Sequence, residues 1–89
     1  MAWKISYEPG VEKFFEKADP QARLQIRNYL RKKIAVNENP KIKGKPLRGQ
    51  WKGFWRYRVG KYRIICNIQD EVLTILVVKI GKRDEVYND

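Results

Sequence analysis

Arginine is the residue of this 89-residue sequence best suited to chemistry, because the chain has no histidine and one cysteine, Cys66. Arg56, Arg58 and Arg63 stand close together in the stretch 55–65. A planar guanidinium donates two parallel hydrogen bonds to phosphate oxygens, which makes arginine a good phosphate ligand. Without histidine, proton transfer must use Lys, Arg, Tyr or a carboxylate. The residue types therefore predict phosphate binding and argue against a metal site or other cofactor.

The positive charge is concentrated in one continuous third of the chain. Lys and Arg number 20, Asp and Glu number 10, and the net charge is +10. Nine basic residues and no acidic residue fall between positions 39 and 69, namely Lys41, Lys43, Lys45, Arg48, Lys52, Arg56, Arg58, Lys61 and Arg63. The positive potential of this stretch attracts a polyanion, and the release of the polyanion's counterions favours binding. The alternative, a basic surface that serves solubility alone, stays open.

Two helices must support these residues from the first half of the chain. Residues 2–7 alternate between polar and apolar and predict a half-buried strand. Pro9 suits the first turn of a short helix that ends near residue 18. Asp19 and Pro20 predict the start of a second helix that runs to about residue 36, with the Asp19 side chain capping the free amides.

Three strands are predicted after a Gly- and Pro-rich basic loop at 40–53, and they span residues 54–59, 61–68 and 72–80. Alternation places Arg56 and Arg58 on one face of the first strand, and hairpin pairing can bring them to Arg63. The last strand is apolar on both faces, which predicts a central position. We therefore expect one α+β domain over residues 1–89, ordered β-α-α-β-β-β. Its small twisted antiparallel sheet would be covered on one side by two helices.

Aromatic residues alternate with basic ones in the same region. Trp51 and Phe54 have two open interpretations, since such residues can stack on bases or close the core. Trp55 and Tyr57 fall on the face opposite the arginines, and for these two we predict a place in the core.

Three motifs carry a resemblance to a known family. They are Lys-Pro-Leu-Arg-Gly at 45–49, Trp-Arg-Tyr-Arg-Val-Gly-Lys-Tyr-Arg-Ile-Ile at 55–65, and Ile-Gly-Lys-Arg-Asp-Glu-Val-Tyr at 80–87. In their order and spacing, and in the order of elements along the whole chain, the sequence resembles the RelE/ParE toxin superfamily. RelE-like members are toxins of two-gene toxin–antitoxin systems that cleave messenger RNA in the ribosomal A site and leave a 2′,3′-cyclic phosphate. ParE-like members share the fold but poison DNA gyrase.

The resemblance implies a catalytic set, carried over position by position: Arg56, Arg58, Arg63, Arg83 and Tyr87. The first three would hold the phosphate, and Arg83 would stabilise or protonate the leaving oxygen. The best-known RelE proteins have lysines at the positions of Arg56 and Arg58, and an arginine cannot act as the base. Tyr87 could be the general base that accepts the proton. It could instead stack on a nucleobase of the RNA, or simply pack within the protein. The lysines Lys52, Lys61 and Lys82 are further candidates for the base.

A second set would grip the RNA backbone without reading its sequence. It comprises Lys41, Lys43, Lys45, Arg48, Lys52, Lys61 and Lys82.

The expected partners follow from the same resemblance. They are a small acidic antitoxin, the ribosome with its A site, and messenger RNA. We expect no cofactor, no membrane partner and a cytoplasmic location, since the start of the chain is unlike a signal peptide and one cysteine fits a reducing compartment. The alternatives are a ParE-like gyrase poison and a non-catalytic RNA-binding module.

Overall fold

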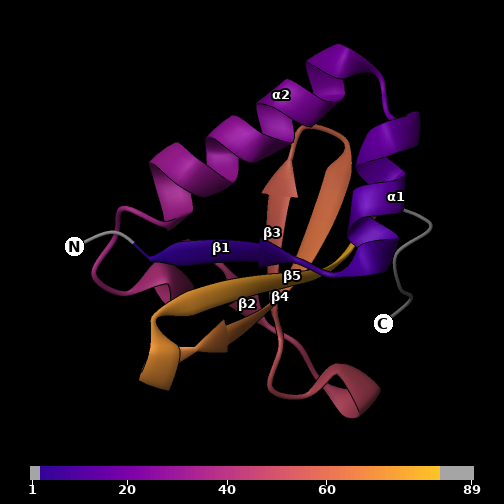
Figure 1. Cartoon of the computed structure of the whole chain (residues 1–89). Helices are drawn as coiled ribbons and strands as arrows, with labels where there is room; N and C mark the ends of the chain where they lie inside the picture. Colours follow the sequence, from indigo (N-terminus) through magenta and orange to yellow (C-terminus); the bar gives the residue numbers. More distant parts are fainter. Residues whose placement is uncertain (1–2, 83–89) are drawn as a thin grey trace.

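The computed structural model describes residues 3–82. The chain forms a five-stranded sheet and two α-helices, the second of which continues into a π-helical turn, Leu30–Ile34 (Figure 1). In chain order the main elements are β1 (Lys4–Tyr7), α1 (Pro9–Lys17), α2 (Pro20–Tyr29), β2 (Lys45–Pro46), β3 (Trp55–Val59), β4 (Tyr62–Gln69) and β5 (Thr74–Lys82).

The α+β fold class predicted from the sequence is confirmed, with one difference in the sheet. The strand order is β1-β5-β4-β3-β2, and β1 runs parallel to β5 while all other pairs are antiparallel. The sheet is therefore mixed, whereas we expected it to be antiparallel. A parallel pair needs a long crossover connection, and the two helices between β1 and the later strands belong to that connection. The short strand β2 lies inside the stretch that the sequence predicts to be a loop.

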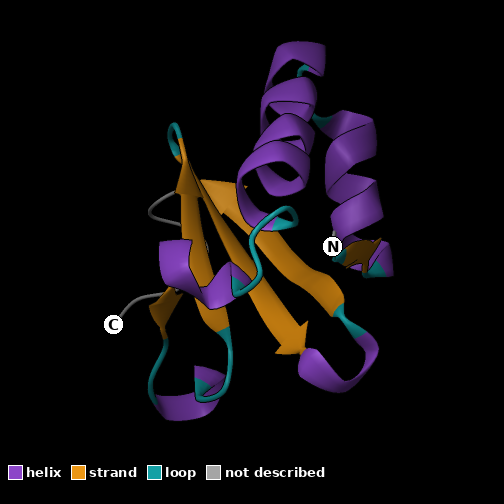
Figure 2. Ribbon diagram, turned by 90° about the vertical axis from the view of Figure 1, so that its left-hand side faces the viewer, coloured by secondary structure: helices purple, strands orange, loops and turns teal. Residues whose placement is uncertain are grey.

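Both helices cover one side of the sheet (Figure 2). Val11 and Phe15 of α1 and Ile26 of α2 are buried against Ile64 and Val77 of the sheet. Both helices begin with proline in the first turn, as predicted. Asp19 occupies the N-cap position of α2, but its side chain forms no capping hydrogen bond, so that detail of the prediction is wrong. The Asp19 carboxylate is exposed, so water can solvate it instead.

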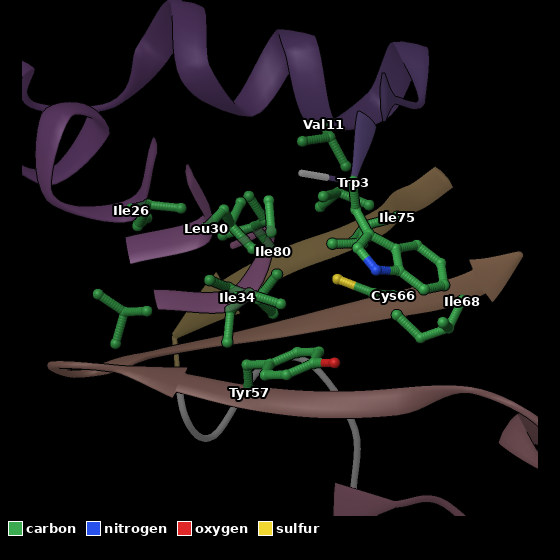
Figure 3. Packing of buried hydrophobic residues seen from close by; sticks show 14 of the residues in the cluster. Trp3, Val11, Ile26, Leu30, Ile34, Tyr57, Cys66, Ile68, Ile75 and Ile80 are labelled. Carbon is green, nitrogen blue, oxygen red and sulfur yellow. The ribbon is translucent and has the colours of Figure 1, made fainter. Parts of the chain in front are cut away.

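The core contains Tyr57 and Cys66 together with other apolar residues from the helices and from β3, β4 and β5 (Figure 3). Burial raises the pKa of the Cys66 thiol, so the thiol stays protonated and packs as an apolar group. Tyr57 is only 1% exposed, and Trp55 packs half-buried against the same core. The predicted core positions of Trp55 and Tyr57 are therefore confirmed. Within residues 3–82, no helix is long and apolar enough to cross a membrane.

A β-bulge divides β5 into two parts. Cys66 of β4 lies opposite Val77, whereas its neighbour Ile65 lies opposite Lys79, so Val78 is the extra residue. The bulge reverses the alternation of β5 after Val77. The strand is interior, between β1 and β4, although β4 and not β5 is the middle strand of the sheet. The bulge decides where Lys79 points.

Candidate functional site

Basic residues gather on the sheet face that the helices leave uncovered. On β3 and β4, Tyr57 and Ile64 point into the core, so their neighbours in sequence point to the opposite face. There Arg58 lies directly opposite Arg63. We call this surface the arginine face; its basic members are Lys45, Arg56, Arg58, Arg63 and Lys79.

Two rows of directly opposed positions make up the arginine face. One row runs Lys45–Arg56–Ile65–Lys79, and the other runs Arg58–Arg63–Gly81. Neither row contains an acidic residue at these described positions. Because Arg58 and Arg63 carry like charges at directly opposed positions, an anion bound between them would interact favourably with both. Each guanidinium can donate two parallel hydrogen bonds, so a phosphodiester is an anion that suits these arginines.

Lys79 belongs to this face although we did not predict it as a site residue. Strict alternation along the strand would place Lys79 with Ile75 and Val77, which are buried in the core. The bulge at Val78 turns Lys79 to the arginine face instead, where its Nζ atom lies 5.9 Å from the centre of the Trp51 ring. The sequence around Lys79 shows two valines followed by a lysine, and this pattern does not predict a bulge.

A small apolar cluster supports the arginine face from within. Leu47 and Ile65 are buried there, and Trp51 and Phe54 pack against them with their rings edge to face. Of the two interpretations of Trp51 and Phe54, the geometry therefore favours packing for both. Each is only half-buried, so part of each ring is still exposed.

The basic stretch before β2 is held in place by Tyr57. The Tyr57 hydroxyl donates a buried hydrogen bond to the Pro40 carbonyl oxygen over 2.8 Å. Gly44 lies against the same ring so closely that a Cβ at this position would be 2.9 Å from Cε2 and Cζ of Tyr57. Lys41 is tied to Asp70 by an ion pair of 3.2 Å. These contacts orient Lys43 and Lys45 toward the β3 edge of the sheet.

We expect Gly44→Ala to destabilise the protein by about 1–3 kcal/mol, because the added methyl group must displace a fully buried ring. Thermal unfolding should detect a drop in Tm of roughly 4–8 °C for each kcal/mol. Gly10→Ala is the matched control, since Gly10 lies in α1 and a Cβ there would have no atom within 4 Å. That control should leave the Tm unchanged or raise it. An equal loss in both variants would contradict the role of the Tyr57 ring.

Three of the lysines predicted to bind RNA adjoin the arginine face. Lys45 is directly opposite Arg56. Lys43 and Lys45 line a pocket of about 150 Å³ whose other walls are Tyr29, Arg56 and Arg58. Lys61 lies in the hairpin turn and lines a smaller hollow of about 50 Å³ with Arg58 and Arg63.

The other predicted RNA-binding residues lie elsewhere. Arg48 and Lys52 flank a short helical turn at the end of β3 remote from the hairpin. Lys41 forms an ion pair with Asp70, and its Nζ atom lies 5.8 Å from the centre of the Trp55 ring. Lys82 is opposite Tyr62, and the two line a hollow with Phe14 on the helix side of the sheet. The arginine face and Lys82 are thus on different sides, because Lys82 and Tyr62 share the alternation of the core-facing residues.

Arg83 and Tyr87 lie outside the described residues. Among the described tyrosines, Tyr29 and Tyr57 both have a pKa raised by burial, so neither is a source of phenolate near neutral pH. The described arginines can therefore donate to a phosphate, and the base, Tyr87 or a lysine, stays a prediction.

Comparison with known proteins identifies the class. A family model described as the ParE toxin of the type II toxin–antitoxin system parDE matches residues 5–87. The chain therefore belongs to this toxin family, as its motifs predict.

Within that family the chain is a type II toxin that resembles RelE. It is 28% identical over 92 residues to the mRNA interferase toxin RelE of Escherichia coli K12, an alignment that covers 100% of this chain and 94% of that protein. Toxin RelG of Mycobacterium tuberculosis is 33% identical over 52 residues, which cover 58% of this chain and 60% of RelG.

A solved structure resembles the chain in its fold. The toxin–antitoxin complex RelBE2 of Mycobacterium tuberculosis contains a chain with a TM-score of 0.83 and 21% identity, and the match covers 96% of this chain and 95% of that one. At this identity the likeness concerns the fold alone.

Proposed function

We propose that this toxin is an endoribonuclease that cleaves messenger RNA in the ribosomal A site. The observation that carries the proposal is the direct opposition of Arg58 and Arg63, with Arg56 in the adjoining row of the same open face. A relative that bears the name mRNA interferase supports the same activity. The RelE-like hypothesis is favoured over the ParE-like one because every position of the implied catalytic set holds a polar side chain.

Cleavage would proceed by attack of a ribose 2′-oxygen on the adjacent phosphorus. The O2′–P bond forms and the P–O5′ bond breaks, which yields a 2′,3′-cyclic phosphate and a free 5′-hydroxyl. The proton of the 2′-hydroxyl passes to a base, and the leaving O5′ takes up a proton. Arg58 and Arg63 would neutralise the charge of the pentacoordinate phosphorus, the role for which a preorganised guanidinium is suited. Arg56 would bind the same phosphate or its neighbour, and Arg83 would serve the leaving oxygen.

The base is assigned to Tyr87 or to a lysine. An arginine stays protonated in a protein, so Arg56 and Arg58 cannot take the proton of the 2′-hydroxyl. If Tyr87 lies beside the arginines, their positive charge would lower its pKa and favour the phenolate. Of the three candidate lysines, Lys61 is the one that shares a hollow with Arg58 and Arg63.

The proposed partners are the ribosome, messenger RNA and an acidic antitoxin. Among solved structures of the same fold are complexes of RelE-like toxins with RelB antitoxins. Nine basic residues and no acidic one between residues 39 and 69 suit an acidic partner, and we place the protein in the cytoplasm with these partners.

Induced expression in bacteria tests the proposal. We expect growth arrest with new 5′ ends of messenger RNA inside translated codons, and we expect Arg83→Ala to abolish both. Lys13→Ala, an exposed change on α1 away from the arginine face, should keep full toxicity. Growth arrest with intact messages and DNA breaks would instead assign the protein to the gyrase poisons. Absence of growth arrest would favour a non-catalytic RNA-binding module.

A further inference from the structure

A groove runs beside α2 and next to the end of β3 at Val59. One stripe of the helix and of the π-helical turn lines it, with residues at positions i, i+3, i+4, i+7 and i+8, and Lys43 and Val59 complete the walls. The stripe residues are Gln25, Asn28, Tyr29, Lys32 and Lys33. Its volume is about 570 Å³, which lies within the usual range for ligand clefts of about 300–1,000 Å³.

The chemistry of the groove suits a nucleotide chain. Lys32, Lys33 and Lys43 contribute three cations, and none of the described lining residues is acidic. Gln25 and Asn28 supply amide groups of the kind that hydrogen-bond to base edges, and Arg31 donates to Asn28 Oδ1 over 2.7 Å. Tyr29 offers a half-buried ring on which a base can stack, and its raised pKa keeps the hydroxyl protonated as a donor.

The groove is continuous with the arginine face. Tyr29 and Lys43 line both the groove and the pocket of about 150 Å³ that Arg56 and Arg58 close from the other side. A chain bound at the arginines can therefore pass Tyr29 and Lys43 and enter the groove without leaving a positively charged surface.

We propose that this groove is a second subsite for single-stranded RNA, and that it holds the nucleotides adjoining those bound at the arginine face. The inference rests on the proposed function and extends it to a longer stretch of substrate. Lys32, Lys33 and Lys43 contact the phosphates, and the Tyr29 ring stacks on a base. RNA is favoured over an acidic peptide because the groove is continuous with the pocket of Arg56 and Arg58, so a single strand can occupy both.

Binding of uncleavable RNA tests the subsite without relying on catalysis. The probes are a trinucleotide and an octanucleotide of RNA with 2′-O-methyl groups at every position, and the readout is fluorescence anisotropy at several salt concentrations. The double variant Lys32→Gln/Lys33→Gln should weaken binding of the octanucleotide and lower the slope of log K against log salt by about 1.4, while the trinucleotide is unaffected. Tyr29→Leu should weaken the octanucleotide by about 5- to 150-fold.

A control of equal charge accompanies these variants. Lys13→Gln/Lys17→Gln removes two exposed lysines from α1 and should leave both affinities close to wild type. Because Lys32 and Lys33 are exposed as well, their variant should fold even if Tyr29→Leu does not.

Three results would overturn the subsite. One is an octanucleotide affinity that falls equally in the groove variant and in the α1 variant. Another is an unchanged octanucleotide affinity in the groove variant while Arg58→Ala weakens it. The third is a groove variant that binds RNA normally but loses affinity for a polyglutamate peptide, which would assign the groove to an acidic protein. If the wild-type protein binds neither oligonucleotide and leaves messages intact in cells, the proposed function itself fails.

Discussion

Arg58→Ala is expected to lower the rate of messenger RNA cleavage on ribosomes by about a hundredfold or more. Arg58 is exposed and lies at the centre of the described site, opposite Arg63 and in the walls of both the hairpin hollow and the larger pocket. Its removal takes a positive charge away from the pentacoordinate phosphorus without opening a cavity in the core. Single-turnover cleavage of a programmed ribosome, with purified protein in excess, measures the effect directly.

One companion variant and one stability measurement make the result specific. Arg58→Lys keeps the charge but loses the paired hydrogen bonds, so we expect an intermediate rate. Arg58→Ala should also leave the Tm unchanged or raise it, because it relieves the repulsion of two cations directly opposite each other. A variant that loses activity because it unfolds would show a lower Tm instead. Full cleavage by a folded Arg58→Ala protein would remove Arg58 from the mechanism.

Free RNA is expected to be a very poor substrate, cleaved about 10⁵-fold or more slowly than the same codon in the A site. The described site is shallow: the pockets at the arginines measure about 150 and 50 Å³, below the usual size of a ligand cleft. Such a surface binds a phosphate but does not by itself bend the ribose so that O2′, phosphorus and O5′ lie in line. We propose that the ribosome supplies this alignment, which is worth about 7–11 kcal/mol in well-oriented reactions.

The measurement compares one messenger sequence in two settings, as naked RNA and positioned on ribosomes, at equal toxin concentration. Cleavage products carrying a 2′,3′-cyclic phosphate identify the reaction and separate it from contaminating nucleases of other mechanisms. Because the sequence has no histidine, raising the pH should speed both reactions by increasing the share of deprotonated base. Efficient cleavage of naked RNA by the pure protein would overturn the expectation.

The local sequence determined the helix starts, the hairpin and the faces of β3 and β4. Pro9 and Pro20 mark the helix starts because proline has its backbone angle already set for the first turn. Arg56, Arg58 and Arg63 could be assigned to one face because side chains alternate with a period of two, and in β3 and β4 nothing interrupts that period. The family motifs then gave these positions their expected roles.

Only the tertiary structure decided which distant elements meet. The parallel pairing of β1 with β5 depends on a crossover through both helices, and no local pattern encodes it. Lys79 joins the arginine face because of the bulge at Val78, which reverses the alternation by a single extra residue. Tyr29 and Lys43 meet beside Arg56 because the buried Tyr57 ring anchors the segment from Pro40 to Gly44. Each of these features depends on contacts between residues far apart in sequence, and periodicity along a single strand or helix carries no information about them.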